Sequence, residues 1–403
     1  MIVKKHSLTK WFSLVVIFIA SCSDKEDPAP KPVNETLIET TSLGSRSLAS
    51  LKVFVQLSGR DIDVDLLAYD VEVLKITYRT TYKGNEINAS GLVLLPKSSN
   101  EFPIVSFHRG TTVEQAETPS AQPLNSEDVV AYSALTSMGF ITVVPDLIGF
   151  AESQDIFHPY YIEEPTADAV ISMLLAAKEL TNERNANFDG RVFLAGYSQG
   201  GYVTMAAHKA LESDPVEGFE VVASFPGAGG YDINHLFEYL RPASNYPDPY
   251  YLAYIGMSYQ SYYERNGLIG EFFNEPYASK IPGLFDGINS GSDINAELTK
   301  NIPGLVREEV LDNDAEYAAN GFLEEKFAEN SPIDWVPVAP MFMYHGSADE
   351  VVPAVNSEVV YDHFLDSGAN PDKLELIIFP GETHGSAVIP YLEDVIPKLQ
   401  AMK

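Results

Sequence analysis

The chain has 403 residues, of which 45% are hydrophobic, 21% charged and 11% aromatic. This composition is that of a globular protein and excludes a disordered, collagen-like or coiled-coil chain, while the length allows one elaborated α/β domain. The 57 acidic side chains outnumber the 26 lysines and arginines and give a formal net charge of -31, which repels phosphate backbones, so nucleic acid is not expected as a partner.

The first 22 residues have the pattern of a bacterial export signal. Basic residues precede an apolar run from Trp11 to Ala20 that is too short to span a bilayer. Residues 19–22 (IASC) resemble a lipobox, in which the peptide is cut before a cysteine that then carries lipid, and Cys22 is the only cysteine of the chain. The alternative is a plain secretory signal with an incidental cysteine. We expect 1–21 to be a lipoprotein signal peptide and the protein to be held in the cell envelope by a lipid on Cys22.

A polar, proline-bearing stretch follows the cysteine. Residues 23–42 show little apolar periodicity, which is typical of an extended tether, and we expect disorder there and a tether over 22–50. The acidic cluster of Asp24, Glu26 and Asp27 resembles the surface-export tag of Bacteroidetes lipoproteins, although such runs are also common in solvated tethers.

The next segments predict a mostly parallel sheet. Two alternating segments, 69–82 and 87–95, flank the turn signal at 83–85 and predict an antiparallel hairpin. Short apolar runs, typical of strands buried on both faces, lie at 102–107, 140–145, 191–195, 220–225, 338–344 and 374–379. Helical periodicity separates them at 167–180, 202–211, 357–365 and 388–402. This alternation predicts an α/β fold with helices on both faces of the sheet.

One long segment interrupts the alternation. No strand pattern occurs between Gly227 and about Pro337, and ten tyrosines and phenylalanines crowd into 246–277. We interpret 228–337 as an inserted helical cap, with the main domain formed by 51–227 and 338–403. Because these aromatics exceed what a small cap needs for its own packing, we expect several to line a substrate pocket, and we select Tyr197, Tyr250, Tyr254 and Tyr262. The alternative is that the aromatics form the small core of the cap itself.

A candidate nucleophile follows the strand at 191–195. Residues 196–200 (GYSQG) match G-x-S-x-G between a strand and a helix, the setting in which this motif places a serine at the apex of a sharp turn. The residues two before and two after Ser198 nearly collide in such a turn, so Gly196 and Gly200 are sterically required. The alternative, a glycine-rich phosphate loop, lacks a G-K-[ST] or G-x-G-x-x-G pattern here.

A serine nucleophile needs a base and an acid that orients the base. Elimination of histidines in the signal, the cap and the helices leaves His108, His158, His345 and His384. His384 lies in a loop directly after the last strand, at the carboxyl edge of the sheet where Ser198 is expected. His345 ends the preceding strand, where a histidine is more often structural. Asp349, in the turn that follows, is the natural acid.

Ser198, Asp349 and His384 in this chain order, with HGSADEVVP at 345–353 and GETHG at 381–385, resemble an α/β-hydrolase over about residues 70–403. Within that superfamily the chain is similar to the bacterial and fungal secretory lipases in GYSQGG, VVPDLIGFAES (143–153) and HRGTT (108–112). The resemblance implies a cap between the sixth and seventh strands, where the interruption lies.

Two positions depart from the lipase pattern. Arg109 stands directly before Gly110, where the lipases carry a histidine, and Ala151 stands where glycine is usual. The resemblance still implies an oxyanion hole made by the backbone N–H groups of Gln199 and Thr111. We expect Asp146 to brace this loop, through Arg109.

The sequence therefore predicts a carboxylic ester hydrolase that forms an acyl-enzyme on Ser198, acts on a small-molecule or lipid ester, and uses no metal or cofactor. The acyl chain, the alcohol and the acyl acceptor stay open. Two alternatives remain: a serine peptidase of the prolyl oligopeptidase type, which usually adds an N-terminal propeller for which there is no room, and a non-catalytic binding lipoprotein that retains the fold.

Overall fold

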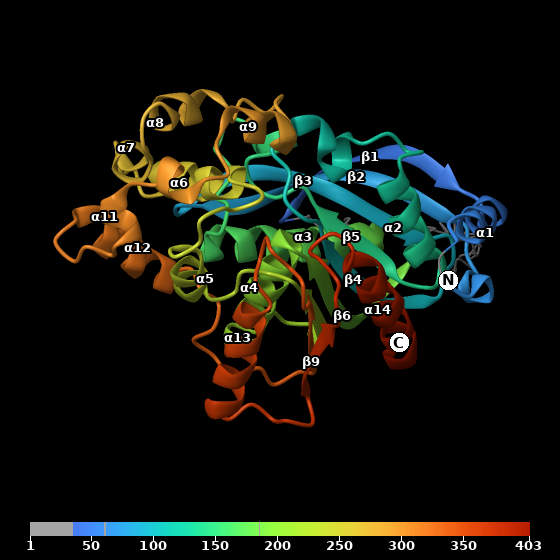
Figure 1. The fold of residues 1–403 in the computed structure, drawn as a ribbon. Helices are drawn as coiled ribbons and strands as arrows, with labels where there is room; N and C mark the ends of the chain where they lie inside the picture. The colour runs from blue at the N-terminus through green and yellow to red at the C-terminus, as the bar shows by residue number, and fades with distance from the viewer. Residues whose placement is uncertain (1–34, 60–61, 185) are drawn as a thin grey trace, which may run out of the picture. The chain divides into compact units, whose positions relative to one another are not determined.

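The computed structural model describes residues 35–59, 62–184 and 186–403 (Figure 1). The predicted signal peptide, Cys22 and the first part of the predicted tether lie outside these residues. One nine-stranded sheet runs through the described chain. Its strands are β1 (Leu37–Arg46), β2 (Val71–Tyr82), β3 (Asn85–Pro96), β4 (Glu101–His108), β5 (Ile141–Pro145), β6 (Asn187–Tyr197), β7 (Glu220–Gly227), β8 (Met341–Gly346) and β9 (Leu374–Phe379).

The strand order in space is β1-β2-β3-β5-β4-β6-β7-β8-β9. The first four strands of that order pair antiparallel, and every later pair is parallel. The predicted hairpin is β2–β3, joined by Lys83 and Gly84, both with positive φ, as a tight turn matched to the twist of the strands requires. The predicted α/β-hydrolase fold is confirmed.

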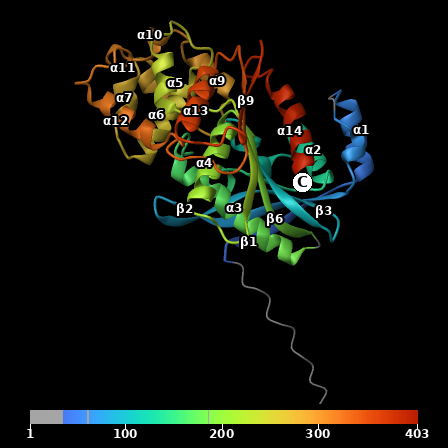
Figure 2. The same cartoon turned by 90° about the horizontal axis from the view of Figure 1, so that it is seen from below.

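Helices cover both faces of this sheet (Figure 2). On one face α1 (Leu48–Leu57), α2 (Glu127–Ser137) and α14 (Val388–Met402) share a buried apolar cluster with the sheet. On the other face α3 (Glu163–Glu183), α4 (Gln199–Ser213) and α13 (Val355–Asp366) enclose two further clusters. Because the strands between them are apolar on both sides, the sheet is the centre of the core.

The segment between β7 and β8 is helical and carries its own apolar cluster. It lies between the sixth and seventh strands of the predicted series, because β1 adds one strand to the count. Its helices are α5 (Ile233–Leu240), α6 (Tyr250–Tyr262), α7 (Leu268–Phe272), α8 (Tyr277–Lys280), α9 (Gly291–Glu297), α10 (Ile302–Leu305), α11 (Glu308–Leu311) and α12 (Ala318–Glu329). Short 3-10 helices occur at Val64–Leu66, Gln115–Glu117, Pro119–Ala121, Ala151–Ser153 and Ile281–Gly283. None of the helices in the described ranges is both long and apolar enough to cross a membrane.

The predicted tether is wrong from Leu37 onward. Residues 37–46 form the edge strand β1, and α1 follows at Leu48. Most β1 side chains are exposed or half-buried, so the strand shows no apolar alternation, but its backbone pairs with β2. The Glu179 carboxylate also accepts from the backbone N–H groups of residues 35–37 at 2.7–3.1 Å. Backbone pairing, which polar side chains do not reveal, orders this segment.

Candidate active site

Ser198 occupies a strained turn between β6 and α4. Its φ of 60° and ψ of −124° lie where a residue with a side chain is seldom found, so the surrounding structure must hold it. A Cβ on Gly196 would lie 2.4 Å from the carbonyl oxygen of Gly200, and a Cβ on Gly200 would lie 2.0 Å from that of His108. Only glycine fits at both positions, which explains the two glycines of the motif.

The structure brings Ser198, His384 and Asp349 into one hydrogen-bonded chain. His384 Nε2 lies 2.8 Å from Ser198 Oγ, and His384 Nδ1 lies 2.6 Å from Asp349 Oδ2. Asp349 accepts only, so the ring donates from Nδ1 and leaves Nε2 free to accept the serine proton. His384 follows β9 and Asp349 follows β8, so both side chains reach the carboxyl edge of the sheet above β6.

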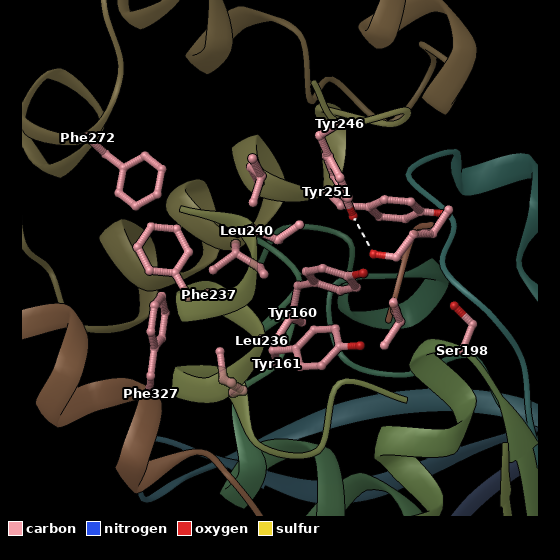
Figure 3. Close-up of a pocket in the computed structure, with 15 residues that line it drawn as sticks. Tyr160, Tyr161, Ser198, Leu236, Phe237, Leu240, Tyr246, Tyr251, Phe272 and Phe327 are labelled. Carbon is pink, nitrogen blue, oxygen red and sulfur yellow. Dashed lines mark hydrogen bonds between the residues drawn. The ribbon is translucent and has the colours of Figure 1, made fainter. Parts of the chain in front are cut away.

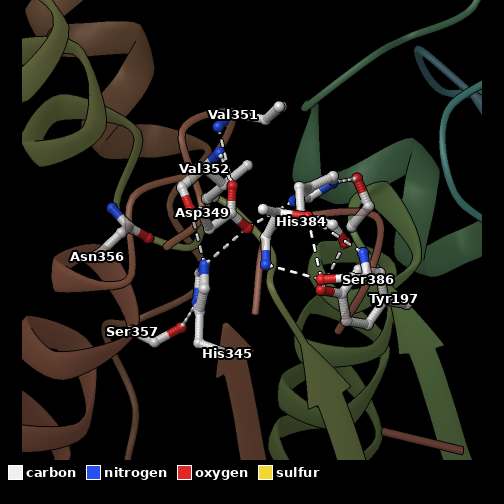
Figure 4. A network of polar contacts seen from close by, with 12 residues as sticks. Tyr197, His345, Asp349, Val351, Val352, Asn356, Ser357, His384 and Ser386 are labelled. Atoms are coloured by element: carbon white, nitrogen blue, oxygen red, sulfur yellow. Dashed lines mark hydrogen bonds and ion pairs between the residues drawn. The ribbon is translucent and has the colours of Figure 1, made fainter. Parts of the chain in front are cut away.

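The Asp349 carboxylate is buried and fully engaged (Figure 4). Its Oδ1 accepts the N–H groups of Val351 and Val352 at 2.8 and 2.9 Å, and its Oδ2 faces His384 and, at 3.2 Å, His345 Nε2. Burial by itself would raise the pKa of Asp349, but the hydrogen bonds from the two histidines outweigh burial and lower this pKa to about 2. Asp349 is therefore ionised at any ordinary assay pH. Neighbouring Glu350 is exposed.

The two predicted oxyanion donors belong to segments that adjoin Ser198. Gln199 is the first residue of α4, so its N–H has no acceptor within the helix. A Cβ on Gly110 would lie 3.8 Å from Ser198 Cβ, which places the segment that carries Thr111 against the serine. The Thr111 hydroxyl is tied to the Tyr160 hydroxyl at 2.9 Å, and this contact orients the segment.

His158, to which sequence reasoning assigned no role, contacts the side chain of Gln199. His158 Nδ1 lies 2.6 Å from the carbonyl oxygen of Ile148, and its Nε2 lies 2.6 Å from Gln199 Nε2. A carbonyl can only accept, so His158 donates from Nδ1 and accepts from the Gln199 amide. Burial lowers the pKa of His158 to about 3, which keeps the ring neutral and preserves this pattern. No local motif marks this contact, because 41 residues separate the partners.

Asp146 contacts Arg109, as expected, but through its backbone carbonyl oxygen and not through its carboxylate. The Arg109 guanidinium donates to the carbonyl oxygens of Gly110 and Asp146, at 3.0 and 3.2 Å, and lies over the ring of Phe150. The Asp146 carboxylate instead accepts from the hydroxyls of Ser90 and Ser120 and from the Ser120 N–H. Arg109 thus connects the segment after β4 to the Asp146 backbone, while Ser90 and Ser120 hold the Asp146 carboxylate.

His108 is part of the scaffold beneath the turn. Its ring nitrogens contact the hydroxyls of Ser106 and Thr204, at 2.9 and 2.8 Å, and burial lowers its pKa to about 3. The Thr204 hydroxyl donates to the carbonyl oxygen of Gly200 at 2.7 Å, so this histidine supports the turn that carries Ser198 and is not part of the Ser198–His384–Asp349 chain.

An apolar cavity extends from Ser198 into the cap, with an empty volume of about 580 Å³ that is partly open to solvent (Figure 3). Ser198 lies at one side of the view, and Phe237, Phe272 and Phe327 lie at the opposite side. Between them the walls come from the segment before α3, from α5 and α6, and from the loop that carries Asp349. These wall residues are Tyr160, Tyr161, Ile233, Leu236, Leu240, Tyr246, Tyr251, Leu252, Ile255, Val351 and Val352.

The residues that line the cavity differ from the tyrosines predicted to line it. Tyr197, Tyr250 and Tyr262 line neither this cavity nor a second, polar one that includes Tyr254, His158 and Phe285. Tyr251 and Ile255, four residues apart on α6, face the apolar cavity, whereas Tyr250 and Tyr254 lie on another face of that helix. The cap is aromatic beside the serine, as predicted, but through different residues.

Each of the four predicted tyrosines makes a contact outside the apolar cavity. Tyr250 packs against Gly291 of α9, and Tyr254 stacks on Tyr160 at 4.5 Å between ring centres. The Tyr262 hydroxyl donates to Glu164 near the surface. The Tyr197 hydroxyl donates to the carbonyl oxygen of His384 at 2.9 Å, so Tyr197 steadies the loop of the candidate base.

Comparison with known proteins supports the fold. No family model and no curated protein matches the sequence. Among solved structures, a protein from Legionella pneumophila with a provisional description as a hydrolase is 28% identical, with a TM-score of 0.79 over 91% of this chain and 98% of that one. The rice cell wall degrading esterase LipA from Xanthomonas oryzae is 24% identical, with a TM-score of 0.79 over 92% and 100% of the two chains. Candida antarctica lipase A is 16% identical, with a TM-score of 0.66 over 92% and 83%.

Proposed function

We propose that this chain is a carboxylic ester hydrolase that works through an acyl-enzyme on Ser198. The observation that carries the proposal is the hydrogen-bonded chain from Ser198 through His384 to a buried, ionised Asp349, with Ser198 in the wall of an apolar cavity. LipA and lipase A, which share the fold, are described as an esterase and a lipase, and this agrees with the proposal.

The reaction has two halves, and His384 takes and then gives up one proton in each. Ser198 Oγ attacks the ester carbonyl carbon while His384 Nε2 takes the hydroxyl proton, and Asp349 stabilises the imidazolium that forms. The N–H groups of Gln199 and Thr111 bind the oxyanion. His384 then gives its proton to the leaving alcohol as the carbon–oxygen bond breaks. In the second half water attacks the acyl carbonyl carbon and loses a proton to His384. His384 then returns that proton to Ser198 Oγ as the bond between Ser198 and the acyl group breaks, which releases the acid and restores the serine.

Covalent labelling tests this function. A fluorophosphonate should react with Ser198 and give an adduct on the peptide that contains residues 196–200, because only an activated serine attacks such a probe. A matched panel of esters and peptides with the same acyl group then separates an esterase from a peptidase. An unlabelled, fully folded protein would favour the binding-protein alternative, and faster cleavage of the peptides would favour the peptidase.

The apolar cavity is the place for the acyl chain, and Phe272 lies at its far side from Ser198 (Figure 3). Phe272→Ala should raise kcat/KM for long acyl esters relative to short ones by about tenfold or more, because each extra buried methylene contributes about 0.8 kcal/mol. A panel of p-nitrophenyl esters of graded length measures this ratio.

Phe273 is the matched control for that substitution. It is an equally buried neighbour in the cap cluster but lines neither cavity. Phe273→Ala should lower the melting temperature as Phe272→Ala does, because both create a hole in the core, and leave the chain-length ratio unchanged. Equal ratios in the two variants would refute the acyl assignment of the cavity.

We also propose export and lipid anchoring in the bacterial cell envelope, on the pattern of residues 1–22. Cys22→Ala should move the protein from the membrane fraction to the soluble fraction, because the thiol that carries the lipid is gone, and leave esterase activity unchanged. Fractionation of cells that express each form measures this. Retention of the variant with the membranes would show that another feature anchors it.

A further inference from the structure

His345, the penultimate residue of β8, is a buried titratable group that the reaction above does not use. Its side chain is 0% exposed, and both ring nitrogens have partners. Nδ1 lies 2.7 Å from the Ser357 hydroxyl at the start of α13, and Nε2 lies 2.7 Å from the carbonyl oxygen of Val352. Nε2 also lies 3.2 Å from Asp349 Oδ2. These contacts direct one side of the imidazole at the candidate acid (Figure 4).

The partners define which nitrogen donates. The Val352 carbonyl and the Asp349 carboxylate can only accept, so Nε2 carries a hydrogen that both oxygens share. Nδ1 then accepts from the Ser357 hydroxyl, which has no other hydrogen-bond partner among the described residues. Ser357 thereby holds the ring in the orientation that presents an N–H to Asp349.

The His345 imidazole thus helps to position both carboxylate oxygens of Asp349. Its N–H lies at Oδ2, the atom that binds His384, and approaches from a second direction. Its bond to the Val352 carbonyl holds the same turn whose N–H groups, from Val351 and Val352, bind Oδ1. Without this ring, Oδ2 would keep His384 as its remaining partner, and the Val352 carbonyl would lose its hydrogen bond to β8.

We propose that His345 is a positioning residue for the reaction: it holds Asp349 Oδ2 in line with His384 Nδ1, and Ser357 in turn holds His345. This inference rests on the proposed function. The role lies in orienting a group that orients the base, so its loss should act on turnover more than on substrate binding, because His345 does not line the acyl cavity.

Few other charges face Asp349. The loop before α14 contributes His384, and the Asp349 turn contributes Glu350, which is exposed. Among the described residues, Asp349 also adds to the raised pKa values of four phenols, which burial raises most, so these phenols stay neutral: Tyr161, Tyr197, Tyr246 and Tyr251. A change in the pH profile of a His345 variant therefore reports on the Asp349–His384 pair.

Three variants test the role of His345, each measured for kcat, KM and the pH profile of kcat/KM, with melting temperature to establish folding. His345→Phe keeps the ring volume and removes the donor, so kcat should fall about 10- to 100-fold with KM within about twofold. A carboxylate with one donor fewer stabilises the imidazolium more, so the acid limb of the profile should move to higher pH by about 0.5 to 1 unit. His345→Gln places an amide N–H at the same number of bonds from Cβ and should restore both values to near wild type.

Ser357→Ala keeps the His345 imidazole but removes the hydroxyl that orients it. The acid limb of the kcat/KM profile should move to higher pH, as in His345→Phe, with a smaller loss of kcat. This variant also tests the role of His345 if His345→Phe does not fold. His208→Phe is the matched control, because His208 is equally buried and lies against Ser224 and Glu212, with no contact to Asp349. It should lower the melting temperature and leave the limb in place.

The inference is overturned if folded His345→Phe retains the wild-type kcat and acid limb, if His345→Gln is as impaired as His345→Phe, or if His208→Phe moves the limb equally. In each of these cases the wild-type protein still hydrolyses esters and still reacts with the fluorophosphonate. A wild-type protein inert to both would instead refute the proposed function, so the two failures are distinguishable.

Discussion

Ser198→Ala should lower kcat for ester hydrolysis by about three to six orders of magnitude while the protein stays folded, because the nucleophile is lost and no other hydroxyl contacts His384 Nε2 among the described residues. His384→Ala should have a similar effect, since Ser198 then lacks a base. The serine is half-buried at the end of a turn held by glycine contacts, so removal of its Oγ leaves the packing intact. Hydrolysis of p-nitrophenyl butyrate, with circular dichroism as the folding check, measures the loss.

The two adjacent carboxylates provide a sharper control. Asp349→Asn should be severely impaired, because the amide presents a donor to His384 Nδ1–H or changes its tautomer. Glu350→Gln changes an exposed neighbour and should retain activity within about twofold of wild type. Strong impairment of Glu350→Gln with an active Asp349→Asn would show that the acid is assigned one residue too early. Near-wild-type activity of folded Ser198→Ala would refute the assignment of Ser198 as the nucleophile.

Gly200→Ala should cost at least about 3 kcal/mol of unfolding free energy, or prevent folding, although it adds a single methyl group. The new Cβ would lie 2.0 Å from the carbonyl oxygen of His108, 2.7 Å from its carbonyl carbon and 2.8 Å from the carbonyl oxygen of Arg109. All three are backbone atoms at the end of β4, a central strand, and they cannot rotate away as a flexible side chain could. Urea denaturation followed by tryptophan fluorescence measures the change.

Gly321→Ala is the control for an added methyl group. Gly321 lies within α12, and no atom lies within 4 Å of the position of its Cβ. Alanine is favoured over glycine in a helix by about 1 kcal/mol, so this variant should be as stable as wild type or more so. Unfolding of Gly200→Ala at the same urea concentration as Gly321→Ala would contradict the close approach of Gly200 to the backbone at the end of β4.

Most of the sheet was predictable because local patterns carry it. Each apolar run from residue 102 onward became a strand with at least one parallel neighbour, and the turn at Lys83 and Gly84 became the hairpin turn. The edge strand β1 was not predictable, because its side chains are polar and its order comes from backbone pairing with β2 and from the Glu179 carboxylate. The α2 helix was also missed.

In the candidate site, too, some residues were predictable from the sequence and others were not. Ser198, Asp349 and His384 follow β6, β8 and β9, and parallel strands bring their carboxyl ends to one edge of a sheet, so position along the chain was enough to select them. The supports behind them were not visible: His158 under Gln199 and His345 behind Asp349 are recognisable only by what their ring nitrogens contact.

By itself the sequence determined the strand–helix alternation, the glycine-flanked nucleophile turn and the placement of a cap before β8, because apolar periodicity and glycine positions act over a few residues. The tertiary structure alone decided which face of α6 looks into the cavity, so that Tyr251 and not Tyr250 lines it. The physical reason is that helical periodicity specifies which side chains share a face, whereas the rotation of that face toward Ser198 depends on packing against α9 and the segment before α3, which are far away along the chain.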